Sequence, residues 1–139
     1  MITWLVDTGP LVAYLDASQD GHAEVTSKAE PFIGRIATTS AVITEAMHFV
    51  GGASTGPRLL VDLLTAWEVD VYDFSEPAGL PEVVALTEQY ANVPMDSADA
   101  TLVLLAEALQ VRDILTLDRR GFSTYRTRPG QGFQLVLDH

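Results

Sequence analysis

Two aspartates stand directly after apolar, β-rich runs. Asp7 follows residues 2–6, and Asp118 follows residues 114–117. In an open α/β sheet the carboxyl ends of the strands form the edge where ligands bind, so both side chains are expected at that edge. Each aspartate could equally cap the helix that follows it. The two gain chemical meaning together if their strands are parallel and adjacent.

Two further carboxylates lie in apolar helical stretches. Glu45 lies within residues 41–50 and Asp99 within residues 97–106. A buried carboxylate without a partner is costly, so each is expected to face a cation or a hydrogen-bond donor. Asp96 precedes Asp99 by one turn and shares its face. A hard divalent cation such as Mg²⁺ would relieve their repulsion, whereas the alternative is a capping box in which Asp99 reaches back to Asp96.

Arg119 and Arg120 come directly after Asp118. Guanidinium groups beside a metal site suit phosphate, although the pair could also belong to a solvated turn with a helix cap. The net charge of −11 argues against nucleic-acid binding when taken alone. Its distribution weakens that objection, because five of the eight basic residues lie near the C-terminus: Arg112, Arg119, Arg120, Arg126 and Arg128.

Strands and helices are expected to alternate along residues 1–139 as one domain. The predicted strands cover residues 2–6, 36–39, 69–72, 113–117 and 133–137. The predicted helices cover residues 9–15, 21–33, 40–50 with Ser40 as N-cap, 57–67, 81–90 and 96–109. Such alternation predicts an α/β fold with a mostly parallel sheet covered on both faces.

Composition narrows the classes of protein. An apolar fraction of 47% argues against disorder. The absence of cysteine excludes disulfides, thiolate catalysis and sulfur-bound zinc, and it fits a reducing cytoplasm. No segment approaches the roughly 20 apolar residues of a membrane helix. The first residues lack a basic region and are not expected to form a signal peptide.

Taken together, the four acidic motifs resemble the PIN-domain family, especially the VapC-type toxins of bacterial toxin–antitoxin pairs. The matching segments are residues 6–11, Thr44-Glu45, residues 95–100 and residues 115–122. Each motif alone is weak, but the set of four in this order and spacing is specific and spans nearly the whole chain.

The resemblance implies a three-layer α/β/α sandwich and a ribonuclease activity. It implies that Asp7, Glu45, Asp99 and Asp118 gather at one cleft and hold Mg²⁺ or Mn²⁺, with Asp96 as a further candidate ligand. Thr8 and Thr116 match places where the family often has a hydroxyl, so they are expected to order the ligands. The resemblance also implies a cytoplasmic homodimer and a protein antitoxin.

The residues also bear on other functions. A haloacid-dehalogenase phosphatase requires a second aspartate two residues after the first, and Gly9 occupies that position. Glu45 and His48 have the Glu-x-x-His spacing of di-iron bundles, but one such motif among strands argues against that site. A PIN nuclease with a housekeeping or DNA substrate, and a PIN-like binding module without catalysis, remain open alternatives.

Overall fold

The computed structural model describes all 139 residues as alternating strands and helices. The strands are β1 (Ile2–Val6), β2 (Arg35–Thr39), β3 (Asp70–Tyr72), β4 (Asp113–Leu115) and β5 (Gln134–Leu135). The helices are α1 (Thr8–Leu15), α2 (His22–Ala29), α3 (Ser40–Val50), α4 (Gly56–Ala66), α5 (Leu80–Gln89), α6 (Ser97–Leu109), α7 (Arg119–Thr124) and the 3₁₀-helix η1 (Val136–Asp138).

The five strands form one sheet in the order β3-β2-β1-β4-β5, and every neighbouring pair is parallel. The strand order reverses at β1, which lies between β2 and β4. Ligand sites of doubly wound sheets lie at such a switch point, beyond the carboxyl ends of the strands. The prediction of a parallel α/β sheet is confirmed, and β1 and β4 are adjacent as the first two aspartates require.

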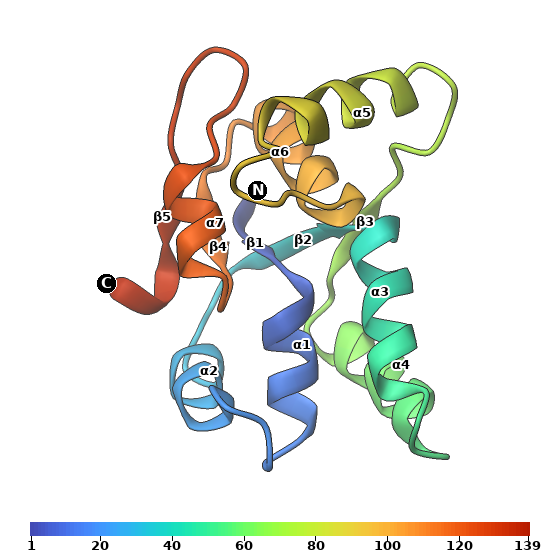
Figure 1. The fold of residues 1–139 in the computed structure, drawn as a ribbon. Helices are drawn as coiled ribbons and strands as arrows, with labels where there is room; N and C mark the ends of the chain where they lie inside the picture. The colour runs from blue at the N-terminus through green and yellow to red at the C-terminus, as the bar shows by residue number, and fades with distance from the viewer.

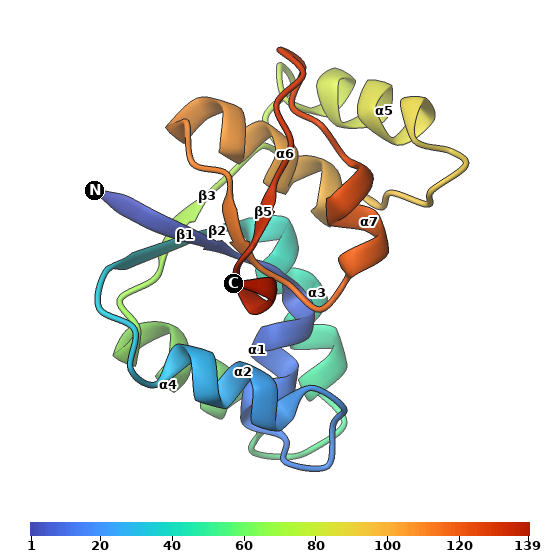
Figure 2. The ribbon, with the colours of Figure 1, turned by 90° about the vertical axis from the view of Figure 1, so that its left-hand side faces the viewer.

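Helices cover both faces of the sheet (Figures 1 and 2). Helices α5 and α6 lie on one side, and α1, α2 and α4 lie on the other, with α3 beside α1, α4 and α6. Eight of the thirteen residues of α6 are buried, because this apolar helix packs directly against β1 and β2. Burying one leucine side chain stabilises a fold by about 1.5–3 kcal/mol, so α6 is a principal part of the core. None of the helices has the length and hydrophobicity that crossing a bilayer requires.

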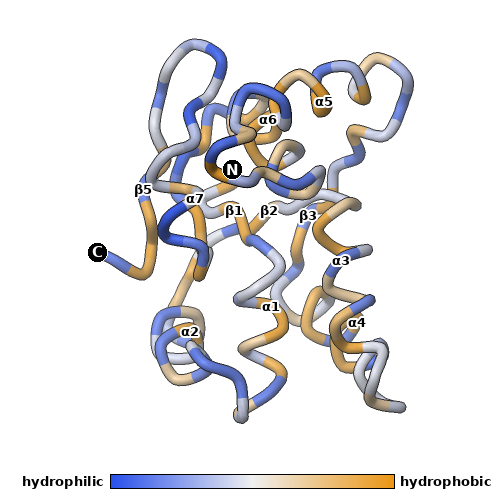
Figure 3. Tube along the Cα trace, viewed as in Figure 1, coloured by the Kyte–Doolittle hydropathy of each residue, from blue (hydrophilic) through white to orange (hydrophobic).

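Several turns of the chain are rich in polar residues. Figure 3 shows hydrophilic colours in the turn before α2 and in the loop after α7, and hydrophobic colours along α1, α3 and α4.

Buried threonine hydroxyls join the central strands to α6. Thr38 Oγ1 donates to the carbonyl of Val6 at 2.7 Å, which ties β2 to the end of β1. Thr39 Oγ1 and Thr101 Oγ1 lie 2.7 Å apart, which ties β2 to α6. These bonds fix the edge of the sheet at which the acidic residues are expected.

Several predicted boundaries were wrong. Ser40 is the first residue of α3, and the N-cap is Thr39, whose hydroxyl accepts from Val42 N at 3.3 Å. The predicted strand 113–117 ends at Leu115. Its end is explained by Thr116 Oγ1, which accepts from Asp118 N at 3.0 Å and turns the backbone away from the sheet. Helix α2 ends at Ala29, well before residue 33.

The C-terminal part of the chain differs most from expectation. Helix α7 was not predicted, because its six residues include a glycine and carry little helix propensity. The predicted strand 133–137 forms sheet bonds only at β5 and then continues as η1.

Candidate active site

A pocket of about 430 Å³ lies at the carboxyl ends of β1 and β4. All the predicted acidic residues line this pocket: Asp7, Glu45, Asp96, Asp99 and Asp118. They come from the end of β1, from α3, from the start of α6 and from the start of α7. A larger depression of about 660 Å³ adjoins it and contains His48, but that depression shares only Glu45 and Asp96 with the acidic set.

Asp7 is the buried centre of the acidic set. Thr116 Oγ1 donates to Asp7 Oδ2 at 2.8 Å, and Thr8 N donates to Asp7 Oδ1 at 2.8 Å. Burial raises the pKa of Asp7 to about 6, although these two hydrogen bonds lower it in part. Because Thr116 Oγ1 also accepts from Asp118 N, this one hydroxyl links Asp7 to Asp118.

Asp118 caps α7, as expected from the alternative interpretation of this residue as a helix cap. Its Oδ1 accepts from Gly121 N at 3.0 Å, and Asp118 is exposed at the wall of the pocket. A carboxylate can accept several hydrogen bonds or metal contacts, so capping uses only part of its capacity. The capping and ligand roles of Asp118 are therefore compatible.

Asp96 and Asp99 form a complete capping box at the start of α6. Asp99 N donates to Asp96 Oδ1 at 2.8 Å, and Asp96 N donates to Asp99 Oδ2 at 3.2 Å. The shorter aspartate reaches back as a glutamate normally would. Burial, together with the nearby charges of Asp7 and Asp96, raises the pKa of Asp99 to about 8. The Asp99 carboxylate thus caps the helix, while its ionised form is disfavoured by its surroundings.

Glu45 approaches the same pocket from α3. Burial raises the pKa of Glu45, and the Asp96 carboxylate adds to the rise. The Thr8 hydroxyl faces Glu45 and lowers that pKa in part, but its contact does not meet the geometry of a hydrogen bond. Thr8 Oγ1 is consequently a buried polar atom without a hydrogen-bond partner at the wall of the pocket.

The donor set fits a hard divalent cation in its chemistry. The pocket wall carries six carboxylates, counting Asp20, and no lysine, arginine or histidine. Oxygen donors of this kind suit Mg²⁺ and Mn²⁺. No three acidic or histidine side chains are grouped closely enough to hold a metal ion as they stand. Cation binding would therefore require the carboxylates of the pocket to move closer together.

Arg119 does not line the acidic pocket. Its guanidinium donates to Glu24 at 2.7 Å and to Asp138 at 2.9 Å, which ties α7 to α2 and η1. These two bonds use two of the five guanidinium N–H donors and place the charge between two carboxylates, which favours a structural role. Arg120, in contrast, is exposed and its side chain makes no hydrogen bond or ion pair.

The other basic residues near the C-terminus are engaged within the chain. Arg128 pairs with Glu82 and Glu107, whereas Arg112 and Arg126 donate to backbone carbonyls. Most of the C-terminal arginines therefore make contacts within the chain.

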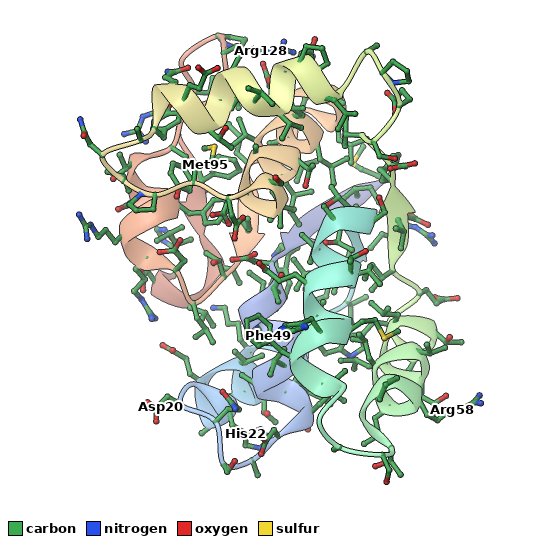
Figure 4. All side chains as sticks on the ribbon, turned by 45° about the vertical axis from the view of Figure 1, so that its right-hand side comes forward. Asp20, His22, Phe49, Arg58, Met95 and Arg128 are labelled. Carbon is green, nitrogen blue, oxygen red and sulfur yellow. The ribbon has the colours of Figure 1, made fainter.

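Sequence reasoning missed four residues of the site region. Asp20 lies on the turn between α1 and α2, and together with the exposed Phe49 it lines the pocket (Figure 4). Tyr125 is fully buried behind the carboxylates, and burial together with their charge raises its pKa, so that the hydroxyl remains a donor. Gly121 lies against Asp118. Only Asp20 had a signal in the sequence, as an acidic residue in a loop.

Gly121→Ala is expected to displace the Asp118 carboxylate. A Cβ at Gly121 would lie 2.3 Å from Asp118 Oδ2 and 2.9 Å from the Tyr125 ring, so one of them must shift. We expect the free energy of unfolding to fall by about 2 kcal/mol in urea denaturation. Gly9→Ala is the matched control, because its Cβ would meet Leu117 at an ordinary 3.6 Å. Equal stability of the two variants would contradict this packing.

The sheet order and the acidic pocket at its switch point define a PIN-like α/β/α domain. No protein-family model matches the chain. It is 29% identical over 136 residues to ribonuclease VapC26 of Mycobacterium tuberculosis, which covers 95% of this chain and 98% of that protein. The resemblance to VapC-type PIN-domain proteins is thus confirmed.

Solved structures with low sequence identity share the fold. VapC20 of Mycobacterium tuberculosis, described as a toxin that cleaves the sarcin–ricin loop, superposes with a TM-score of 0.70 at 13% identity, covering 84% of this chain and 91% of VapC20. VapBC2 of Rickettsia felis bound to promoter DNA gives 0.63 at 16% identity, covering 96% and 98%. FitAB bound to a DNA fragment gives 0.62 at 11% identity, covering 97% and 96%.

Proposed function

We propose that this chain is a ribonuclease of the VapC type that hydrolyses RNA phosphodiester bonds with Mg²⁺ or Mn²⁺. The observation that carries this proposal is the meeting of Asp7, Glu45, Asp99 and Asp118 in one pocket without a basic side chain. Hydrogen bonds and helix caps account for part of this arrangement. They do not account for keeping so many carboxylates together where their pKa values are raised.

The proposed reaction is attack of water on phosphorus, with cleavage of the bond to the leaving oxygen. When bound, the divalent cation acts as a Lewis acid that activates water and offsets negative charge on the phosphate. One carboxylate of the set accepts the proton that the attacking water loses. Thr116 and Thr8 N hold both oxygens of Asp7 in one orientation, so its remaining lone pairs point to a fixed place.

A toxin of a toxin–antitoxin pair is the setting that the relatives support. VapC26 is a ribonuclease by name, and VapBC2 was solved with DNA from its promoter. We accordingly propose RNA as substrate, a protein antitoxin as partner and a homodimer as the assembled form. Leu80 and Val84 on α5 are exposed and offer apolar surface for contact with the antitoxin or with the second copy of the chain.

Cleavage of RNA by the purified chain tests the function. We expect defined fragments from a total-RNA pool in millimolar Mg²⁺ and none with excess EDTA. Induced expression should arrest growth if the chain is a toxin. Cleavage without arrest would favour a housekeeping nuclease, and partner binding without cleavage of any RNA or DNA would favour a binding module.

Arg119 and Arg120 are expected to differ when each is replaced by alanine. Arg120→Ala should raise the KM for RNA by about 5-fold without changing Tm, because its exposed guanidinium is free to contact phosphate. Arg119→Ala should lower Tm by about 3 °C and leave KM unchanged, because its two partly exposed ion pairs stabilise the fold weakly. Steady-state kinetics and thermal melts separate the two effects, and the reverse assignment would contradict these roles.

A further inference from the structure

Two tyrosines connect the segments that carry the acidic residues of α6 and α7. Tyr125, at the end of α7, donates through Oη to the carbonyl of Pro94 at 2.7 Å. Pro94 lies two residues before Asp96, which begins the capping box of α6. The largest fully buried side chain of the protein therefore holds the loop from which Asp96 and Asp99 project.

The second tyrosine makes the reciprocal contact. Tyr90, at the end of α5, accepts from Arg126 N at 2.9 Å through its hydroxyl. The rings of Tyr90 and Tyr125 pack edge to face with centroids 5.1 Å apart. Each tyrosine hydroxyl thus makes a hydrogen bond to the backbone near the other tyrosine, and the two rings pack between these hydrogen bonds. We call the pair of tyrosines with these two bonds the tyrosine clasp.

The clasp lies directly behind the acidic pocket. A Cβ at Gly121 would lie within 3 Å of both Asp118 and the Tyr125 ring, so that ring closely backs the Asp118 carboxylate. Phe122 supports the Tyr125 ring from α7 with centroids 5.2 Å apart. One side of the clasp is therefore linked to Asp118 and the other side to Asp96 and Asp99.

We propose that Tyr125, assisted by Tyr90, is a positioning residue that sets the distance between the α6 and α7 carboxylates for cation binding. This proposal rests on the proposed metal-dependent function, because it assigns the carboxylates a shared ligand. Like charges on two separate helix ends move apart unless the ends are held, and the clasp supplies a neutral restraint across them. Tyr125 acts through the backbone of Pro94 and contacts neither substrate nor cation.

Tyr125→Phe tests the proposal, because it removes one hydroxyl and keeps the buried ring. Tyr14→Phe is the matched control, since Tyr14 also packs edge to face, against Trp67 at 4.9 Å, and its hydroxyl makes no hydrogen bond. We expect the Mn²⁺ dissociation constant, measured by calorimetry without RNA, to rise about 10-fold in Tyr125→Phe. It should remain unchanged in Tyr14→Phe. Amide hydrogen exchange at Asp96 and Asp99 should also become faster in Tyr125→Phe alone.

The cleavage rate provides the second readout. In Tyr125→Phe the Mg²⁺ concentration for half-maximal cleavage should rise by a similar factor, while the rate at saturating Mg²⁺ stays within about threefold. A lower Tm with unchanged Mn²⁺ affinity and unchanged exchange would overturn the positioning role and leave a packing role only. Absence of Mn²⁺ binding to the wild type would also overturn it. Mn²⁺ binding with the expected shift, but without RNA cleavage, would reject the nuclease function and keep the clasp.

Discussion

The Asp99→Asn variant is expected to cut RNA at least about 10³-fold more slowly than the wild type at saturating Mg²⁺. Asparagine keeps the size of the side chain and an oxygen that can accept from Asp96 N, so the start of α6 should stay folded. It removes the negative charge that a cation requires. Asp7→Asn should show a similar loss, because Asp7 is the buried centre of the set.

Asp62→Asn is the matched control, since Asp62 is exposed on α4 and does not line the pocket. Cleavage by this control should equal that of the wild type. Undiminished cleavage by both Asp99→Asn and Asp7→Asn would reject the assignment of these carboxylates to the reaction.

The stability of the protein in EDTA is expected to fall as the pH rises from 5 to 8.5. The pKa values of Asp7 and Asp99 are raised in the folded chain to about 6 and about 8, from 3.8 for an ordinary aspartate. The folded state therefore binds more protons than the unfolded state, and stability is lost as these groups ionise. Partial exposure and coupling of Asp99 reduce its effect, so we expect a combined loss on the order of 3 kcal/mol, or about 10 °C in Tm.

Mg²⁺ should reverse most of this loss. At pH 8.5 the carboxylates are ionised, and a cation that binds only the folded state raises Tm. At pH 5 protons compete for the same oxygens, so the rise should be much smaller. Thermal melts at both pH values, with Mg²⁺ and with EDTA, provide the measurement. Asp99→Asn should melt higher than the wild type in EDTA at pH 8.5; a pH-independent Tm in EDTA would contradict the raised pKa values.

Most of the fold follows from local patterns in the sequence. The runs that end at Asp7 and near Asp118 predict buried strands, and their parallel pairing brings the two aspartates together. Glu45 and Asp99 were predictable because a charge on an apolar helix needs a partner. The strands and the apolar helix faces depend on spacing within a few residues, which a single sequence displays directly.

The parts that were not predictable depend on contacts between distant residues. Arg119 pairs with Glu24, 95 positions away, and no local pattern in the sequence indicates this ion pair. The Tyr125 hydroxyl finds a carbonyl 31 positions away. Helix α7 has weak intrinsic propensity and forms because Asp118 caps it and Phe122 is buried. Tertiary structure decides each of these cases.

The helix caps formed by Asp7, Asp96 and Asp118 have a consequence for how such a protein changes in evolution once its activity is lost. Three helices begin at residues that the reaction is proposed to use, so selection for folding and selection for catalysis act on the same positions. In a relative that has lost its activity but is kept for another purpose, these three aspartates should therefore be replaced by asparagine or serine more often than by alanine. Asparagine and serine still cap a helix. Inactive descendants would be recognised by these polar substitutions, and the acidic residues would disappear before the helices do.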